Sequence, residues 1–284
     1  MDIGTALKKI RTNLNLNLEE MSAGVITASH YSKIEKGYHR ISAEDLLQIL
    51  NIHSIDVATF FKSLTRDDHN SFYQKMNQRI VSAFYQGNLN ELLSITKEIE
   101  QENEIISNNK YYLLALAESC IYTLDDSRII PIETKEFIEE KLFQLPNWNL
   151  FKLTLYANFV ELYSIESNQL IICSILSKSL DNYSTNEQIA ILSILLNYVG
   201  ECIEIEEYNL AQYYLTQINL INSNSENFFY KVLGKYYENI LQIINSNNNK
   251  SREIVDQIIQ LMQVSGLEFF GDQLREYLIE KTSN

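Results

Sequence analysis

A long internal recurrence constrains the fold of this chain more than any other feature. Polar or glycine breaks recur at intervals of 40 or 41, at Gly87, Ser127, Ser167, Tyr208 and Asn248. An apolar, helix-forming stretch such as "LNELLSI", "LIICSIL" or "LAQYYLTQI" follows each break. A period of about 40 residues is typical of stacked helix pairs, in which each pair buries its apolar face against the next. The pattern therefore predicts an α-solenoid over most of the chain.

Few helix-breaking residues interrupt these stretches. Only two prolines and eight glycines occur in 284 residues, and 45% hydrophobic residues are enough to form a large core. We predict an all-α protein whose second part is a tetratricopeptide-like α-solenoid of about five helix pairs. The predicted helical segments are 71–86, 89–103, 110–124, 132–144, 149–164, 168–182, 186–203, 208–222, 226–245, 250–264 and 267–281.

The N-terminal part, up to Phe61, shows a different organisation, with closely spaced helix start and stop signals. Asn17, with Glu20 three residues later, is a capping pair, and Thr27 and Ser42 are N-cap residues for two further helices. Gly37 stands where a left-handed residue commonly ends a helix. Five short helices with a tight turn between the second and third are typical of helix-turn-helix DNA-binding domains.

The third of these predicted helices carries the residues that are suited to contact DNA. Tyr31 and Ile34 lie three residues apart and face inward, which leaves small, polar and basic residues outside. Such a face fits a major groove about 12 Å wide, while lysine and arginine neutralise phosphates. The alternative interpretation is that Lys33, Lys36 and Arg40 form an ordinary solvated surface.

Four segments in this part, "IGTALKKIR", "LNLEEMSAGV", "YSKIEKG" and "ISAEDLLQILNI", resemble the phage-repressor-like (XRE, Cro/C1-type) helix-turn-helix family in order and spacing. The resemblance implies that residues of the third helix approach base edges and that flanking basic residues reach phosphates. The predicted DNA-binding residues are Lys8, Arg11, Thr27, Ala28, Ser29, His30, Ser32, Lys33, Lys36 and Arg40.

The formal charge of -14 is unevenly distributed along the chain. Residues 1–66 carry eight basic and seven acidic side chains, whereas the remainder carries 15 basic and 30 acidic ones. The acidity therefore belongs to the repeats, which phosphate would repel. The small basic surplus of the first part indicates weak DNA affinity for one copy, so we expect a dimer that reads two half-sites of double-stranded operator DNA.

The repeat also predicts a set of residues along the concave face. Polar residues recur at intervals of 39 or 40 on the first helix of each pair, and side-chain amides at such intervals can hold the main chain of a bound peptide. Arg79 could pair with a peptide carboxylate. The alternative is that these residues lie on exposed helix faces without a function. The predicted peptide-binding residues are Arg79, Glu118, Asn158, Asn197, Tyr198 and Tyr237.

The combination of this helix-turn-helix segment with about five helical repeats resembles the Rgg (Rgg/GadR/MutR) regulators, members of the peptide-responsive RRNPP class. The resemblance implies a homodimeric cytoplasmic transcription factor, usually an activator. Its repeat domain would bind a short, often hydrophobic signalling peptide, as in quorum sensing. We predict a DNA-binding domain at 1–64, a linker at 65–70, and a peptide-binding and dimerisation domain at 71–284. A competing interpretation is a regulator or adaptor whose repeats bind a partner protein and no peptide.

Several other classes of function are disfavoured. The sequence lacks a phosphate-binding loop, a dinucleotide-binding glycine pattern, a GxSxG elbow and an HExxH zinc motif. All four histidines precede residue 70, so the repeats have no side chain with an ordinary pKa near 7 for acid-base catalysis. His30 and His39 lack the spacing and cysteine partners of metal ligands. We therefore expect no enzyme, no cofactor and no metal.

Cellular location and cysteine chemistry follow from simple observations. No run of about 20 apolar residues and no signal pattern occurs, so we expect a cytoplasmic protein without a membrane span. Cys120, Cys173 and Cys202 are odd in number and widely spaced, and we interpret them as buried small hydrophobic residues.

Overall fold

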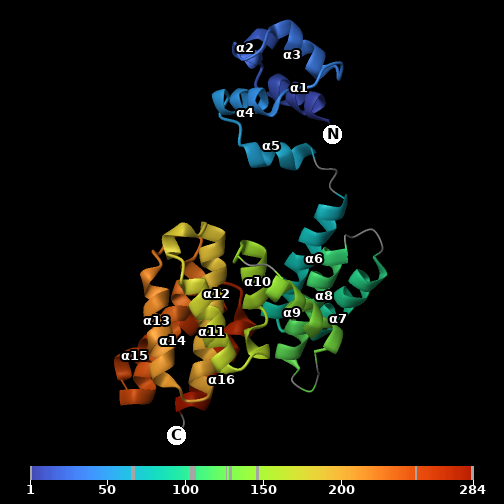
Figure 1. Cartoon of the computed structure of the whole chain (residues 1–284). Helices are drawn as coiled ribbons and strands as arrows, with labels where there is room; N and C mark the ends of the chain where they lie inside the picture. Colours follow the sequence, from blue (N-terminus) through green and yellow to red (C-terminus); the bar gives the residue numbers. More distant parts are fainter. Residues whose placement is uncertain are drawn as a thin grey trace. The chain divides into compact units, whose positions relative to one another are not determined.

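The computed structural model describes residues 2–64, 68–102, 107–125, 127, 130–144, 147–246 and 248–282. Every regular element within these residues is a helix, and none of them is a β-strand (Figure 1). The all-α prediction is thus confirmed. The chain divides into two compact units, the N-terminal unit Met1–Phe72 and the repeat unit Tyr73–Asn284.

The predicted linker at 65–70 differs from what the structure places there. Residues 65–67 lie outside the described residues, whereas Asp68, His69 and Asn70 already belong to helix α6 (Asp68–Tyr85). This helix therefore begins three residues before the predicted start at residue 71.

The N-terminal unit is built from short helices whose ends follow the capping signals of the sequence. Asn17 accepts hydrogen bonds from the backbone N–H groups of Glu19 and Glu20, both at 2.9 Å, and the Glu20 carboxylate accepts from Asn17 N at 2.7 Å. Thr27 and Ser42 cap the next two helices, as predicted. The helices are α1 (Ile3–Asn13), α2 (Leu18–Ser22), α3 (Ala28–Glu35), α4 (Ala43–Ile52) and α5 (Val57–Leu64).

A small apolar core holds these helices together. Tyr31 and Ile34 of α3 are buried, as their spacing predicted, and they pack with Leu7 of α1, Met21 of α2 and Leu50 of α4. This packing orients α3, because burying Tyr31 and Ile34 on one side leaves the opposite side of the helix in solvent.

The repeat unit consists of helix pairs followed by a single helix. Each of the predicted segments corresponds to one helix that lies wholly or largely within it, and the ends differ by three residues or fewer except at the C-terminal ends of 149–164 and 168–182. The pairs are α6 with α7 (Leu89–Gln101), α8 (Ser107–Leu124) with α9 (Ile132–Gln144), α10 (Leu150–Ala157) with α11 (Ile165–Leu176), α12 (Thr185–Glu204) with α13 (Tyr208–Leu220), and α14 (Phe228–Ser246) with α15 (Asn249–Val264), before α16 (Glu268–Thr282).

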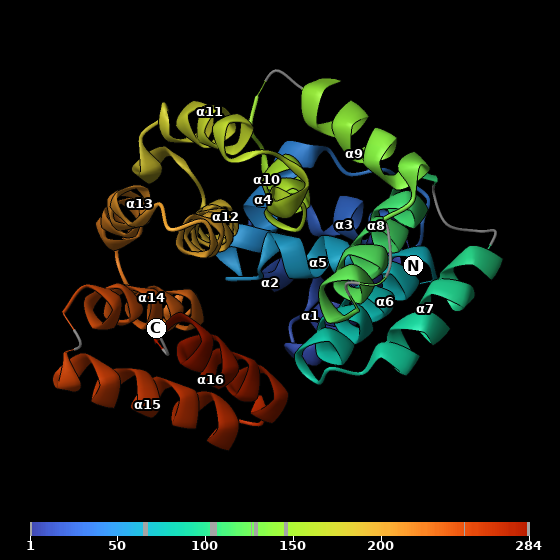
Figure 2. The same cartoon turned by 90° about the horizontal axis from the view of Figure 1, so that it is seen from below.

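Within the repeat unit the pairs follow a curve (Figure 2). The first helix of each pair and α16 lie on the inner side of the curve, and the second helices α7, α9, α11, α13 and α15 lie outside. Successive inner helices pack on one another, as α12 does on α10 and α14. The predicted concave face lined by the first helices is therefore present.

Two predicted helices are shorter than their segments. The segment 149–164 forms α10, which ends at Ala157, and then a 3-10 turn η1 (Val160–Leu162). The Asn158 amide donates to the Thr154 carbonyl at 2.8 Å, and Phe159 leaves helical geometry at φ -135°. This side-chain hydrogen bond replaces a backbone bond and favours the end of the helix at this point. Similarly, the segment 168–182 contains most of α11, which begins at Ile165 and ends at Leu176, and then a second turn, η2 (Leu180–Asn182).

The cysteine prediction is correct for one residue only. Cys202 is buried, Cys120 is half-buried and Cys173 is exposed, and all three are free thiols. The prediction for Cys173 is wrong because this residue lies on the solvent-facing side of the outer helix α11. A hydrophobic residue type in an outer helix does not by itself establish burial.

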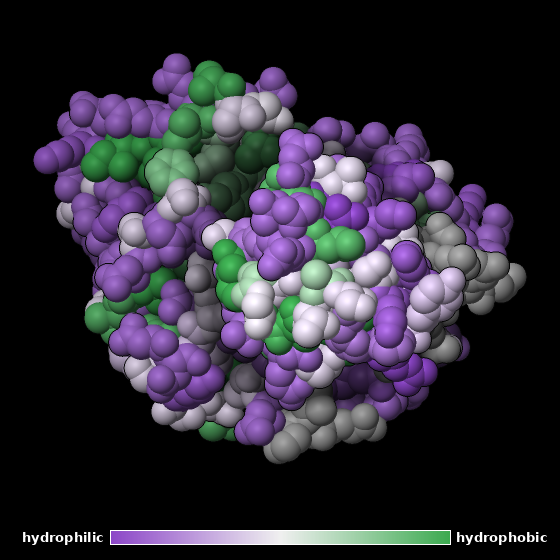
Figure 3. Space-filling model, turned by 90° about the horizontal axis from the view of Figure 1, so that it is seen from above, coloured by the Kyte–Doolittle hydropathy of each residue, from purple (hydrophilic) through white to green (hydrophobic). Residues whose placement is uncertain are grey.

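The surface carries hydrophobic residues in separate patches among hydrophilic ones (Figure 3). Exposed large hydrophobic side chains include Tyr38, Leu170 and Val264, each more than 70% exposed. Among the residues that the structure describes, no helix combines the length and apolar character needed to cross a bilayer.

Candidate functional site

The N-terminal unit presents α3 as the helix after the tight turn. Most of the predicted DNA-binding residues are exposed or half-buried on its outer side or beside it. Gly37, with φ +74°, ends the helix region in the left-handed conformation that the sequence predicted, and His39 and Arg40 follow after Tyr38. The exposed residues of the set are Lys8, Thr27, Ser29, Lys33, Lys36 and Arg40, and the half-buried ones are Arg11, Ala28, His30 and Ser32.

Arg11 differs from the other predicted DNA contacts because its guanidinium is bound within the fold. Arg11 Nε and Nη2 donate to the two carboxylate oxygens of Glu35 at 2.7 and 3.0 Å, and Nη1 donates to the Leu16 carbonyl at 3.0 Å. The Glu35 hydrogen bonds raise the pKa of Arg11. This bidentate pair joins α1 to α3. The geometry gives Arg11 a structural role, and its predicted contact with DNA stays a prediction.

His30 and His39 contact each other on this face. Their Nδ1 atoms are 3.1 Å apart, with the rings in an edge-to-face arrangement. One ring must donate and the other accept, so the pair holds α3 against the segment that follows Gly37. Among the described residues, no group of three or more histidine, cysteine or acidic side chains is placed to bind a metal ion.

The repeat unit contains a groove of about 670 Å³ on its inner side. Residues of α6, α8, α10, α12, α14 and α16 line it, together with Val160 and Glu161 of η1. Polar side chains are concentrated on α8, α10 and α12, whereas aromatic ones are concentrated where α6, α14 and α16 meet. The groove therefore has a polar region and an aromatic region.

In the polar region the amide side chains are fixed by bonds to the backbone. Asn158 Nδ2 donates to the Thr154 carbonyl at 2.8 Å, and Asn197 Nδ2 donates to the Ala157 carbonyl at 2.7 Å. Ser119 Oγ donates to the Asn158 carbonyl at 2.8 Å. Because a backbone carbonyl only accepts, each amide must turn its nitrogen toward the protein. The amide oxygens remain as acceptors for N–H groups of a ligand.

The aromatic region joins the first and last helices of the curve. The ring of Tyr85 on α6 lies 5.9 Å from Phe229 of α14 and 5.3 Å from Phe270 of α16, measured between centroids. Gly87, with φ +63°, lies two residues after the end of α6, and a Cβ there would lie 2.6 Å from the ring of Phe269. The repeat unit thus closes on itself, and glycine is required where the ring of Phe269 approaches the backbone.

Three of the six predicted peptide-binding residues line the groove. Asn158 at the end of α10, Asn197 on α12 and Tyr237 on α14 contribute to its wall. Burial raises the pKa of Tyr237 to about 12, with a smaller contribution from nearby acidic side chains. These residues stand where the recurrence along the chain predicted, and their contact with a peptide remains a prediction.

The other three predicted residues lie outside the groove lining. Arg79 Nη2 pairs with Glu91 Oε1 at 2.7 Å and Nη1 with Glu98 Oε2 at 2.5 Å, both on the outer helix α7. Glu118 accepts a hydrogen bond from Thr134 of α9, and burial raises its pKa. Tyr198 is buried and donates to the Ile165 carbonyl at 3.0 Å. Each is committed to a neighbouring helix or turn, so the structure does not support the predicted groove contacts.

Sequence reasoning missed several groove residues, some of which had a detectable signal. Tyr277 follows Tyr237 at the interval of the recurrence and continues the same series onto α16, with ring centroids 6.0 Å apart. Ser119 precedes Asn158 by nearly the same interval. Tyr85 and Phe270 had no such signal, because they meet only through the closure of the curve.

Two acidic side chains beside the polar region have raised pKa values. Burial, with a smaller contribution from the charge of Glu161, raises the pKa of Glu201 to about 7, although the hydrogen bond that Asn168 donates to Glu201 at 3.0 Å lowers it. The surrounding protein also raises the pKa of Glu161, by reducing its hydration. The same Asn168 accepts from the Tyr156 hydroxyl at 2.6 Å and is fully buried.

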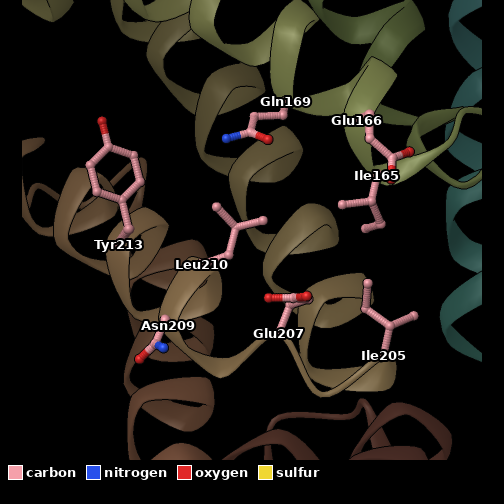
Figure 4. A pocket seen from close by; sticks show the side chains of 8 residues that line it. All are labelled: Ile165, Glu166, Gln169, Ile205, Glu207, Asn209, Leu210 and Tyr213. Carbon is pink, nitrogen blue, oxygen red and sulfur yellow. The ribbon is translucent and has the colours of Figure 1, made fainter.

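A second hollow, of about 630 Å³, lies among outer helices of the repeat unit (Figure 4). Its side chains come from α11, from α13 and from the loop before α13, and they spread around the hollow without converging on one point. It is lined by Ile165, Glu166, Gln169, Ile205, Glu207, Asn209, Leu210 and Tyr213. Because its polar groups do not converge, we consider the inner groove the better candidate site.

Solved structures with a similar fold cover nearly the whole chain. A putative transcriptional regulator from Listeria monocytogenes EGD-e is 19% identical, with a TM-score of 0.74, and 99% of this chain aligns with 98% of that one. The SHP pheromone receptor Rgg2 from Streptococcus dysgalactiae is 15% identical, with a TM-score of 0.70, over 99% and 100% of the two chains. The PrgX/iCF10 complex is 20% identical, with a TM-score of 0.70, over 99% and 96%.

Two sequence families match successive parts of the chain. A helix-turn-helix family matches residues 7–60, which include α2, the turn and α3. The family described as the C-terminal domain of the HTH-type transcriptional regulator Rgg matches residues 93–276, which is more than half of the chain and contains most of the groove. The chain therefore belongs to the Rgg family of helix-turn-helix transcriptional regulators.

Proposed function

We propose that this regulator binds operator DNA through α3 and a short apolar peptide in the inner groove, and that the peptide controls DNA binding. We further propose that it acts as a homodimer in the cytoplasm. The observation that carries the peptide assignment is the groove itself. Fixed amide oxygens line one region of it and aromatic rings the other. Amide oxygens accept from the peptide main chain, whereas the aromatic region accepts apolar side chains.

Support from similar proteins is consistent with this assignment. Similar structures are described as a pheromone receptor and as a PrgX/iCF10 complex, at 15% and 20% identity. These descriptions apply to those proteins and not to this chain. For this chain, the position of acceptors and rings along one groove is the physical reason to expect a peptide.

The DNA assignment depends on the exposed side of α3. Ser29, Lys33 and Lys36 are exposed there, and Tyr31 and Ile34 hold the opposite side in the core. One copy offers few cations, so two copies on adjacent half-sites would supply the affinity that one lacks. We expect binding to a promoter fragment to fall steeply with salt concentration.

The peptide assignment is tested with the purified full-length protein and a pool of short apolar peptides. Native mass spectrometry detects bound peptides, and fluorescence of Trp148, the single tryptophan, follows unfolding of the repeat unit. We expect selected peptides to bind and to raise the unfolding temperature. Absence of binding, together with co-purification of a partner protein, would instead favour an interaction protein.

A variant sharpens this test. Asn158→Ala combined with Asn197→Ala removes two acceptors from the groove, and we expect peptide affinity to fall about tenfold. Asn209→Ala is the matched control, because Asn209 is an exposed amide in the outer hollow. Equal affinities of the double variant and the control would contradict the assignment of these amides.

A further inference from the structure

The groove lining of the repeat unit carries very little charge. Glu161 is the one charged side chain among the described residues that line it, and the others are amides, hydroxyls, a thiol, aliphatic groups and aromatic rings. The described lining includes no lysine or arginine. A carboxylate on a ligand would therefore find no cation in the lining with which to pair.

Glu161 is held in a fixed position within the polar region. It lies on the turn η1 directly after Phe159 and Val160, which are buried and anchor the turn in the core. Leu162 N donates to the Phe159 carbonyl at 3.1 Å, and Asn168 Nδ2 donates to the Val160 carbonyl at 2.9 Å. The backbone that carries Glu161 is thus bonded on both sides.

The carboxylate of Glu161 is exposed toward the groove and forms no hydrogen bond or ion pair with any described residue. Its charge nevertheless acts on the surrounding groups, because it contributes to the raised pKa values of Glu201 and Tyr237. A carboxylate that lines a groove without a protein cation is a suitable partner for a cation that arrives with the ligand.

The neighbouring groups reinforce this preference. Glu201 lies close enough for its pKa to respond to Glu161, and rings such as Tyr237 and Tyr277 offer π faces that attract cations. A ligand carboxylate at the same point would meet the carboxylate of Glu161. The polar region thus favours positive charge and disfavours negative charge.

We propose, on the basis of the peptide function above, that Glu161 selects peptides carrying one positive group, which it binds in the polar region while apolar side chains occupy the aromatic region. The positive group is an ammonium or guanidinium, supplied either by a lysine or arginine side chain or by the peptide N-terminus. Peptides with an acidic side chain at that point are excluded.

The test uses three matched pools of apolar octapeptides that differ at one randomised position, which is lysine, glutamine or glutamate. All pools have acetylated N-termini, and binding to the full-length protein is measured by native mass spectrometry and fluorescence anisotropy at fixed salt. We expect wild type to prefer lysine over glutamate peptides by about tenfold or more. A fourth pool, with glutamine and a free N-terminus, distinguishes the terminal amine from a side chain as the source of the charge.

Two variants assign the preference to Glu161. Glu161→Gln should reduce the lysine preference about tenfold, and Glu161→Lys should reverse it. Glu166→Gln is the matched control, since Glu166 is an exposed carboxylate in the outer hollow. An equal loss in this control would show that the net charge of -14, and not Glu161, causes the preference.

The outcomes separate this inference from the function on which it depends. Binding of all pools with equal affinity would overturn the role of Glu161 and leave a peptide receptor. Binding of none of the pools would overturn both. In a third outcome, the pool with glutamine and a free N-terminus binds as tightly as the lysine pool and loses this advantage in Glu161→Gln. That result would support the inference and identify the peptide N-terminus as the cation.

Discussion

The two units place their candidate functional residues in different settings. On α3 of the N-terminal unit, Ser29, Lys33 and Lys36 are exposed on the outside of a small apolar core, and no described residue forms a side-chain hydrogen bond with them. In the repeat unit, Asn158 and Asn197 line a groove, and each side-chain amide is bonded to a backbone carbonyl. A surface for a long charged partner can leave its side chains mobile, whereas a groove for a short ligand benefits from side chains fixed beforehand.

The largest expected effect tests the exposed side of this comparison. Lys33→Ala combined with Lys36→Ala should weaken binding to a promoter fragment about 100-fold and flatten its salt dependence, because two phosphate contacts are lost per copy. Both side chains are exposed, so the unfolding temperature should not change. Electrophoretic mobility shifts over a range of salt concentrations measure the effect. Unchanged DNA binding would show that α3 does not face the duplex.

The second prediction concerns Arg11, the exception in the N-terminal unit. Arg11→Ala leaves Glu35, whose side chain is only 6% exposed, without its ion-pair partner. We expect the N-terminal unit to lose about 2–3 kcal/mol of stability, and DNA binding to decline through unfolding. Lys8→Ala is the control on the same helix, and it should change stability by less than about 0.5 kcal/mol. Circular dichroism during urea unfolding separates the two. Equal stabilities would mean that the pair contributes little.

The third prediction tests the closure that forms the groove. Gly87→Ala adds a Cβ against the ring of Phe269 at a left-handed φ of +63°, so we expect a loss of about 2 kcal/mol in the repeat unit. Adding Phe269→Ala removes the contact with the ring but not the backbone strain. The double variant should therefore recover part of the lost stability. Trp148 fluorescence during unfolding reports on this unit alone, because the chain has no other tryptophan. A double variant no more stable than Gly87→Ala would place the whole cost in the backbone.

Short-range signals made the fold predictable from the sequence. The caps at Asn17, Thr27 and Ser42 and the regular recurrence of breaks depend on neighbours along the chain, and they located the helices to within a few residues. Capping bonds join residues two or three apart, so the local sequence determines them.

The direction in which each side chain points was harder to predict. Each step along an α-helix turns a side chain by about 100°. Tyr198 therefore points into the core although its neighbour Asn197 lines the groove, and Glu118 faces α9 although Ser119 lines the groove. A spacing argument that is wrong by one residue selects the wrong face.

Groove residues outside the recurrence had no local signal at all. Tyr85 and Phe270 lie far apart along the chain and meet only when the curve closes. Glu161 lies on η1, inside a segment that the pattern predicted as continuous helix. Such residues depend on the tertiary arrangement of distant helices, which the sequence pattern does not specify.

The smallest expected effect concerns the charge beside the groove. The folded-state pKa of Glu201 is about 7, above its ordinary value of 4.5. Between these values the unfolded chain has lost this proton while the folded chain keeps it, so the stability of the repeat unit should fall as pH rises from about 4.5 to 7. Glu201 is only half-buried and solvent screens part of the effect, so we expect a loss of stability of about 1 kcal/mol.

Glu201→Gln should remove this contribution and stabilise the unit above pH 7, as measured by Trp148 fluorescence during urea unfolding from pH 5 to 8. Glu206→Gln, at an exposed position nearby, is the control and should follow wild type. If Glu201→Gln also follows wild type, the carboxylate is hydrated in the folded protein, and the polar side chains of the repeat unit are then no less hydrated than those on α3.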